Sequence, residues 1–246
     1  MRRRAIPTWE AVASAAIVAL AASTAWFALE GAVDRRKEET CLSNLQRIAA
    51  AMRMYEDDYG GKLVPYVSFG SPATAGARYT KLVAPYLGNI MVFRCPSDRL
   101  STSNLSGAPP YPTTYGMNWY ISGVAGTGGG LQYPGVPRAN VVDPSHTVCL
   151  SDCAVIDKTT MALPVGQWRE DAKAAPTADI YYFYLPWDPS GWTGSGLALV
   201  RPFPRHAGRL NVTFYDGHAE TILADRIPTK ATDQGQPGCI WDNVAG

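Results

Sequence analysis

The sequence carries almost no net charge, which excludes one class of partner. Its 22 Lys and Arg residues nearly balance its 21 Asp and Glu residues, so the formal net charge of the 246-residue chain is +1. A protein that binds nucleic acid through the phosphates needs a basic field, and an acidic block would be typical of a solvating tail. Since the sequence has neither feature, we expect no nucleic-acid partner.

The sequence also lacks the short motifs of several enzyme classes. It contains no G-x-x-x-x-G-K-[ST], no G-x-S-x-G and no H-E-x-x-H, and no internal repeat is visible. The glycine-rich run at 126–130 is neither preceded by a strong strand pattern nor followed by a helix pattern. It therefore predicts a loop and not a phosphate cradle. We expect neither an enzyme nor a bound cofactor.

Cysteines are few and odd in number, which leaves the disulfide pattern open. They are Cys41, Cys95, Cys149, Cys153 and Cys239. One or two bridges are compatible with an exported protein, but the sequence does not choose partners for the last three. Cys149 and Cys153, with His146 and Asp152, also allow a zinc interpretation. C-x3-C spacing alone supports it weakly, because a thiol inside an apolar strand-like run is more often simply buried.

A long uncharged run is the most informative feature that the sequence does contain. Residues 11–29, between Glu10 and Glu30, carry no charge, and this length is close to the ~20 residues that span a hydrocarbon core. Three arginines at positions 2–4 precede the run. By the positive-inside rule they stay in the cytoplasm and the rest of the chain lies outside. A cleaved secretory signal is the alternative, but the helical pattern continues to Gly60.

The pattern after the uncharged run is that of an amphipathic helix. Apolar residues recur at intervals of three or four, as on one face of a helix. They are Cys41, Leu45, Ile48, Met52, Tyr55 and Tyr59. We therefore predict one helix from about Thr8 to about Asp58, roughly 75 Å long at about 1.5 Å per residue. Its first half should lie in lipid or against other apolar helices, and its second half on a globular domain.

These residues resemble the start of a type IV prepilin or a type II secretion pseudopilin. A short basic leader ends at a small residue, Ala5, and cleavage after it would make Ile6 the first residue and Glu10 the fifth. The segments “CLSNLQRIAAAMRMYEDDYGG”, “FRCPSD”, “TYGMNWY” and “SHTVCLSDC” are similar to one branch of these proteins. Residues 206–217 match the signature of that branch, the prepilin-type processing-associated H-x9-DG domain.

The resemblance implies a division of the chain and a set of partners. The implied parts are a basic leader at 1–5, a long helix at 6–60 with its transmembrane half at about 8–30, and a globular domain at 61–246. The implied partners are a prepilin peptidase, other pilin-like subunits and the bacterial inner membrane. The implied function is structural: a subunit that assembles through its helix into a type II secretion or type IV pilus-like filament.

Two residue pairs also follow from the resemblance. Glu10 would pair with the freed amine at Ile6 of a neighbouring subunit, which agrees with the need of a carboxylate in a dry helix bundle for a cation. Cys41 and Cys95 are the favoured disulfide, because both lie in segments similar to the family.

The H-x9-DG match predicts a β-hairpin. Residues 210–215 alternate between apolar and polar side chains, as in a half-buried strand. Asp216 and Gly217 favour a two-residue type I′ turn, after which residues 218–223 form the return strand. The expected buried face consists of Leu210, Val212, Phe214, Ala219 and Leu223.

That hairpin register decides how the signature is interpreted. It pairs Thr213 with Glu220 and places His206 and Asp216 at opposite ends of one strand. We therefore interpret the signature, including Gly217, as a structural turn motif. The weaker interpretation is a metal site at Asp216 and His218, which would make the chain a metal-dependent enzyme.

Apolar runs in the remaining sequence predict further strands joined by long loops. The runs are 91–94, 115–121, 147–150, 180–185 and 197–200. With the N-terminal helix they predict an α+β fold, in which the second half of the helix packs on a small antiparallel sheet.

Two further interpretations concern binding. The aromatic-rich segment 181–192 could contact a glycan or a protein, which would make the chain a single-pass membrane-anchored binding module. Anchoring of loops by large side chains is the plainer interpretation. Asp57 and Asp58 can offer oxygen ligands to calcium, although two carboxylates without a full coordination set support a site only weakly.

Overall fold

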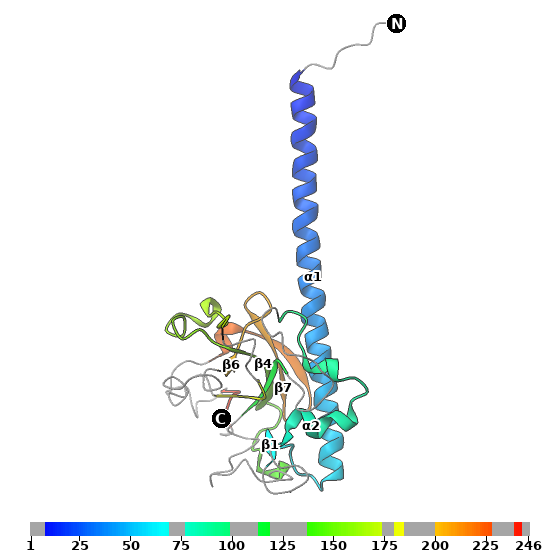
Figure 1. Cartoon of the computed structure of the whole chain (residues 1–246), viewed down its shortest axis with the longest axis vertical. Coiled ribbons are helices and arrows are strands. Elements are labelled where there is room, and N and C mark those ends of the chain that lie inside the picture. Colours follow the sequence, from blue (N-terminus) through cyan, green and yellow to red (C-terminus); the bar gives the residue numbers. More distant parts are fainter. Residues whose placement is uncertain are drawn as a thin grey trace.

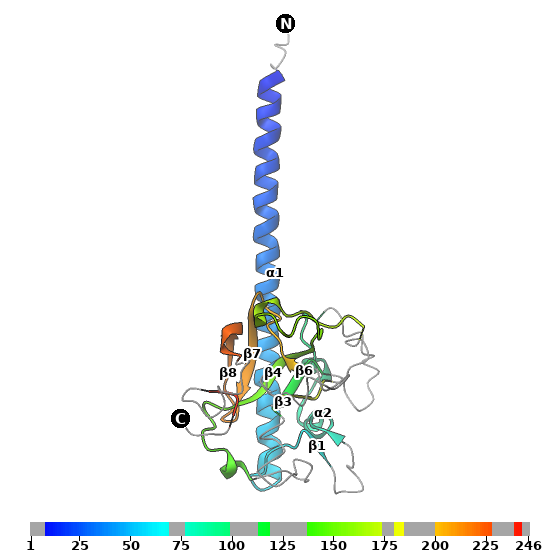
Figure 2. The ribbon, with the colours of Figure 1, turned by 90° about the vertical axis from the view of Figure 1, so that its left-hand side faces the viewer.

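A single long helix extends from one side of an α+β head (Figure 1). The computed structural model describes residues 8–68, 77–98, 113–118, 137–173, 180–184, 200–227 and 239–242. Both views show the helix projecting far beyond the head, with only its second half alongside it (Figures 1 and 2). The chain therefore has the α+β architecture that the sequence predicts.

The helix α1 (Thr8–Asp58) has the predicted limits, and its 51 residues extend over about 77 Å. Its apolar stripe is buried from Cys41 to Tyr55, while Tyr59, just beyond the helix, is partly buried. The helix ends where Gly60 and Gly61 take positive φ angles of 66° and 76°, a conformation that glycine adopts without steric cost. The Gly61 N–H donates to the Glu56 carbonyl oxygen at 2.8 Å, which satisfies an otherwise unpaired carbonyl at the helix C-terminus.

The head is built on a six-stranded sheet in the order β5-β3-β4-β7-β8, with β6 paired to β4. The strands are β3 (Tyr115–Asn118), β4 (Val148–Val155), β5 (Tyr182–Phe183), β6 (Val200–Pro202), β7 (Arg209–Phe214) and β8 (Ala219–Leu223). The pair β3–β5 is parallel and the other pairs are antiparallel. The expectation of a purely antiparallel sheet is therefore wrong: the chain passes through β4 before it returns to the edge of the sheet, and such a connection permits a parallel pair.

Shorter elements surround this sheet. A two-stranded sheet pairs β1 (Val67–Ser68) with β2 (Ala77–Arg78), and the helix α2 (Tyr79–Val83) follows directly. The 3-10 helices are η1 (Ala84–Tyr86), η2 (Ile90–Phe93), η3 (Arg138–Asn140), η4 (Val165–Gln167) and η8 (Ala224–Arg226).

Side-chain alternation along β7 divides the core into two clusters. Leu210, Val212 and Phe214 belong to the cluster that also holds Trp241. Because successive side chains of a strand point to opposite faces, Asn211 points the other way, and its side-chain amide donates to the Glu38 carbonyl oxygen of α1 at 3.2 Å. The second half of α1 therefore covers the face of the sheet to which Asn211 points. The cluster that holds Trp241 covers the other face.

One predicted strand is a 3-10 helix. Residues 91–94 fall in and just after η2, where Val92 and Phe93 are buried while Met91 is 49% exposed. The Asn89 side chain accepts a hydrogen bond from the Met91 N–H at 2.8 Å, as a helix N-cap does. A short apolar run does not by itself distinguish a strand from a buried helical turn.

The other predicted strands are present with different lengths. The run 115–121 corresponds to β3, beyond which the chain is not described until Pro137, and the run 180–185 contains only the two residues of β5. The run 147–150 is the start of the longer β4. Of the run 197–200 only the last residue, the first of β6, lies within the described part of the chain.

The H-x9-DG segment forms a hairpin, but its turn is not the predicted one. The Gly217 N–H donates to the Phe214 carbonyl oxygen, and the Phe214 N–H donates to the His218 carbonyl oxygen, both at 3.0 Å. This makes a three-residue loop, in which Gly217 alone has a positive φ, of 98°. A type I turn followed by a glycine bulge has this form, whereas a type I′ turn needs a positive φ at Asp216 as well.

The longer loop shifts the register of the hairpin by one residue. Thr213 pairs with Ala219 and not with Glu220. A shift of one residue moves every side chain of a strand to the other face. Accordingly Ile222 is buried at 7% exposure, while Leu223, expected in the core, is 56% exposed.

A two-residue turn of the predicted type occurs earlier, at Ala207 and Gly208. Both residues have positive φ, of 50° and 82°. His206 and Arg209 exchange both backbone hydrogen bonds, at 2.9 and 3.0 Å, which is the arrangement of a type I′ hairpin. The turn folds His206 back over the start of β7 and leaves this residue only 5% exposed.

We expect Gly217→Ala to lower the free energy of unfolding by about 1–2 kcal/mol. A Cβ at Gly217 would meet the Arg53 Nε at 3.6 Å, an ordinary contact, so the loss should come from the φ of +98°. Gly88→Ala is the matched control, because nothing lies within 4 Å of its added Cβ. Chemical denaturation measures both, and equal losses at the two positions would contradict the assigned turn.

Candidate functional site

The first half of α1 exposes apolar side chains to its surroundings. Its most apolar 18-residue window has a mean hydropathy of 1.9 and no buried residue. The large exposed apolar side chains are Trp9, Val12, Ile17, Val18, Leu20, Trp26, Phe27 and Leu29, at 60–71% exposure. By length and composition this helix can cross a membrane.

The predicted processing and assembly residues lie at the start of this region. Ala5 and Ile6 fall outside the described residues. Glu10 belongs to α1, and only its backbone is described.

Polar contacts join α1 to the rest of the head where the helix reaches it. The Arg209 Nη2 lies 2.6 Å from the Glu38 Oε2, and the Asn44 side-chain amide donates to the Arg94 carbonyl oxygen at 3.1 Å. A cavity of about 280 Å³ lies beside the Glu38–Arg209 pair, between α1 and the turn at 205–209.

A disulfide between Cys41 and Cys95 links α1 covalently to the head. The S–S distance is 2.11 Å and the Cα–Cα distance is 5.1 Å. This is the pair that the resemblance favours. It closes a loop with a sequence separation of 54, and constraint of a loop of that length in the unfolded chain stabilises a protein by about 4 kcal/mol.

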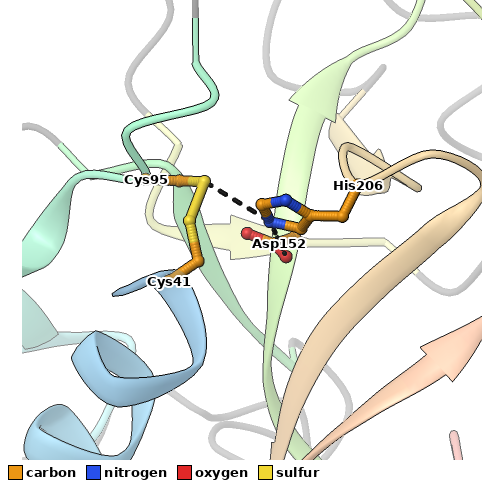
Figure 3. Close-up of side chains that lie close together, drawn as sticks. All are labelled: Cys41, Cys95, Asp152 and His206. Carbon is orange, nitrogen blue, oxygen red and sulfur yellow. Dashed lines mark hydrogen bonds and ion pairs between the residues drawn. A yellow bond between two sulfur atoms is a disulfide. The ribbon is translucent and has the colours of Figure 1, made fainter. Parts of the chain in front are cut away.

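A buried histidine and a buried aspartate lie against this disulfide (Figure 3). The His206 Nε2 is 3.5 Å from the Cys95 Sγ and 3.3 Å from the Asp152 Oδ2. Asp152 is 0% exposed, and its Oδ2 accepts a hydrogen bond from the Asn211 N–H at 2.8 Å. The other ring nitrogen of His206, Nδ1, lies 3.4 Å from the Ser97 Oγ. The first residue of the H-x9-DG signature therefore has a fixed place in the core.

Arg205, next to this histidine, forms a buried ionic network. Its Nη1 donates to the Glu170 Oε1 at 2.9 Å and to the Asp98 Oδ1 at 3.4 Å. Its Nη2 donates to the Cys153 carbonyl oxygen at 2.6 Å. The side chain is only 3% exposed, so the two carboxylates supply the negative charge that a buried guanidinium requires.

Sequence reasoning missed Arg205 and the role of Asp152. Arg205 belongs to no short motif, and Asp152 was considered only as a zinc ligand beside Cys149 and Cys153. Their partners are distant in sequence, with separations of 107 for Arg205–Asp98 and 59 for Asp152–Asn211. The available signal was local: a charged residue beside the signature histidine, and an aspartate inside an apolar run. Charged groups at such positions need buried partners.

The other three cysteines are free, and the zinc interpretation of the C-x3-C spacing is wrong. Cys149 and Cys153 lie in different core clusters, and positions four apart on a strand are separated by roughly 13 Å, too far for a disulfide or one ion. His146 is exposed and pairs with Asp143 at 3.0 Å, while Asp152 lies with His206. Burial raises the pKa of the Cys149 and Cys153 thiols, so both are poor nucleophiles.

Asp216 and His218 contact each other at the tip of the hairpin. The Asp216 Oδ1 lies 2.6 Å from the His218 Nδ1 and also accepts a hydrogen bond from the His218 N–H at 3.0 Å. The imidazole stacks on the Phe214 ring at 4.2 Å. Within the described parts of the chain, groups of three or more potential ligands occur only at the disulfide. The tip of the hairpin thus offers two potential ligands, Asp216 and His218. His206 cannot join them, because it lies at the other end of β7.

A second ionic group holds the hairpin against the end of α1. The Glu56 Oε2 lies 2.8 Å from the Arg138 Nη1 and 3.2 Å from the Arg53 Nη1. The same two arginines donate to the carbonyl oxygens of Asp216 and Tyr215. Burial raises the pKa of Glu56 to about 7, although the positive charge of Arg53 opposes the shift. The group joins helix, hairpin and η3.

Part of the aromatic-rich segment, and both aspartates considered for calcium, lie within the described residues. Tyr182 packs on Tyr181 and on Tyr184, and Tyr66 contacts Tyr181 and Tyr182, so these rings act as anchors for their own segment. The tryptophans at 187 and 192 lie outside the described residues. Of the two aspartates proposed for calcium, Asp58 accepts a hydrogen bond from the Tyr86 hydroxyl at 2.6 Å.

Comparison of the chain with protein-family models, with curated proteins and with solved structures finds no match in any of the three.

Proposed function

We propose that this chain is a membrane-anchored, pilin-like structural subunit that assembles through its N-terminal helix. The observation that carries the proposal is the exposed apolar half of α1, which projects from the head (Figure 1). An apolar helix exposed on all sides is stable in lipid or in a bundle of similar helices. Because arginines at positions 2–4 precede the helix, the head lies outside the cytoplasm.

Small residues along α1 support assembly in addition to anchoring. Ala15, Ala19 and Ser23 recur at four-residue intervals. Small side chains at such intervals let helix backbones approach closely in lipid, where no hydrophobic force drives association. The resemblance to prepilins and pseudopilins points to the same use of the helix.

The contacts that hold α1 against the head support a role as a structural subunit. The Cys41–Cys95 disulfide and the Glu38–Arg209 pair hold the helix against the sheet. A helix packed in an assembly would then place its head in a defined orientation. We propose no catalytic role, and as partners other pilin-like subunits, the bacterial inner membrane and a prepilin peptidase that cuts between Ala5 and Ile6.

We expect a photo-crosslinking amino acid at Val18 to join the full chain to a second copy or to other pilin-like subunits in native membranes. Val18 is 68% exposed on the apolar half of α1, where neighbouring helices would contact it. Leu163, 43% exposed on the head, is the control position. Mass spectrometry identifies the adducts and shows whether the mature chain starts at Ile6.

The same experiment separates assembly from the alternative function. Adducts of Val18 to lipid alone, together with adducts of the head to a protein or a glycan, would contradict assembly. They would favour a single-pass binding module.

A further inference from the structure

Four potential metal ligands meet at the disulfide (Figure 3). Cys41, Cys95, Asp152 and His206 each offer one donor atom, and these atoms all lie within 4.8 Å of one another. All four residues are buried. We infer that the chain binds one zinc ion through these four residues when the disulfide is reduced, so that zinc and the disulfide are alternative links between α1 and the head.

Two of the distances between donor atoms already match those of a zinc site. Two thiolates, an imidazole and a carboxylate are typical zinc ligands, with bonds of about 2.3 Å to sulfur and about 2.0–2.2 Å to nitrogen and oxygen. In a tetrahedron these bonds place nitrogen about 3.6 Å from sulfur and about 3.4 Å from oxygen. The His206 Nε2 lies 3.5 Å from the Cys95 Sγ and 3.3 Å from the Asp152 Oδ2. The two sulfur atoms, now bonded at 2.11 Å, would have to separate, and the other donor-atom distances, all within 4.8 Å, would have to adjust.

Hydrogen bonds behind the ligands orient them as zinc sites require. The Asp152 Oδ2 accepts from the Asn211 N–H at 2.8 Å, and the His206 Nδ1 lies 3.4 Å from the Ser97 Oγ. Such outer contacts fix the ring and the carboxylate of metal-binding residues. The Asp152 Oδ1 is buried without a hydrogen-bond partner. A buried carboxylate oxygen without a partner calls for an explanation, and an ion bound by the Asp152 carboxylate would be one.

The cavity beside α1 gives an ion a route to the cluster. Its lining includes Lys37 from the helix and Ser97 and His206 from the head, and its volume is about 280 Å³. His206 is therefore the ligand that an ion entering from solvent would meet first. The cavity lies where the apolar half of α1 joins the head, so the site would be near the membrane surface.

The two links exclude each other because they use the same sulfur atoms. A phosphine reductant cleaves the S–S bond: the phosphine becomes a phosphine oxide, its oxygen comes from water, and the two sulfurs take up two electrons and two protons. Zinc then displaces the proton of each thiol and binds both thiolates. Oxidation by a disulfide compound would reverse the sequence and release the ion. The inference does not depend on the assembly of the subunit.

The test uses the full chain in detergent, reduced anaerobically with a phosphine and freed of it. We expect one equivalent of zinc in the reduced chain and none in the oxidised chain, measured with a chromogenic chelator. Cobalt in place of zinc should give the visible absorption of a tetrahedral thiolate site. His206→Gln and Asp152→Asn should each weaken zinc binding at least ~10-fold. His218→Gln, at the exposed tip of the hairpin, is the matched control and should bind as the parent does.

Two measures keep the outcome decisive. Formation of the Cys41–Cys95 bond on oxidation of each variant shows that it still folds around the cluster. A second series with Cys149 and Cys153 replaced by alanine removes the other buried thiols. The inference is overturned if the reduced chain takes up no zinc, or if His206→Gln and Asp152→Asn bind zinc as tightly as the parent. It is also overturned if slower reoxidation of the thiols is the sole effect of His206→Gln.

Discussion

Arg205→Met should lower the free energy of unfolding by about 3–5 kcal/mol, because removal of one partner of a buried ion pair leaves the other charge uncompensated. The Arg205 side chain is 3% exposed and contacts Glu170 at 2.9 Å and Asp98 at 3.4 Å. Methionine has a similar length and keeps much of the packing. It removes the cation shared by the two carboxylates and the donor to the Cys153 carbonyl oxygen.

Urea denaturation of the full chain in detergent, followed by tryptophan fluorescence, measures this loss, since Trp168 and Trp241 are buried in the head. Arg169→Met is the matched control: this arginine is exposed, and its loss should change stability by less than about 0.5 kcal/mol. Adding Asp98→Asn and Glu170→Gln to Arg205→Met should recover about 1–2 kcal/mol, because the unpaired charges are then gone. A loss as small as that of Arg169→Met would contradict the importance of the network.

The long helix is predictable because two local patterns agree over its whole length. The uncharged run at 11–29 has the length of a membrane-spanning helix, the stripe that starts at Cys41 repeats with helical spacing, and glycines at 60 and 61 supply the end. Helical periodicity over such a length depends on neighbours three and four residues apart. Tertiary contacts therefore have little influence on whether this segment is helical.

The hairpin shows where local reasoning reaches its limit. Asp216 and Gly217 are compatible with a two-residue or a three-residue loop, and the two differ by one residue in register. The choice of the longer loop coincides with contacts from distant residues: Arg53 and Arg138 donate to the carbonyl oxygens of Asp216 and Tyr215. No pattern within the hairpin sequence reports those arginines.

The cluster at the disulfide was predictable only in part. The Cys41–Cys95 pair follows from the resemblance, and His206 was identified as part of a signature. Its position against Asp152 depends on the turn at Ala207 and Gly208, where a non-glycine residue adopts a φ of +50°. Alanine is not a residue that signals this conformation. The residue pattern placed His206 at one end of the strand without predicting its burial, and the structure leaves it only 5% exposed.

Glu10→Ala should leave the head folded and the helix inserted in the membrane, yet reduce co-assembly of the chain at least ~10-fold. Glu10 is the only charged residue between Arg4 and Glu30, at the edge of the apolar run. For an isolated anchor, removal of a carboxylate from this position favours insertion by a few kcal/mol at most. In a bundle of helices, loss of the carboxylate leaves a neighbour's N-terminal amine unpaired, which costs about 3–5 kcal/mol. Anchoring and assembly thus predict opposite signs for one substitution.

Crosslinking from Val18 in native membranes measures this difference, and protease protection of the head reports insertion. Glu30→Ala is the matched control, since Glu30 lies at the other end of the apolar run and accepts a hydrogen bond from the Trp26 indole at 2.9 Å. Its removal takes away one carboxylate without affecting the pair at the N-terminus, so crosslinking should persist. If Glu10→Ala crosslinks as well as the parent and Glu30→Ala do, the carboxylate has no role in assembly. The helix would then be an anchor, and the function of the chain would have to lie in its head.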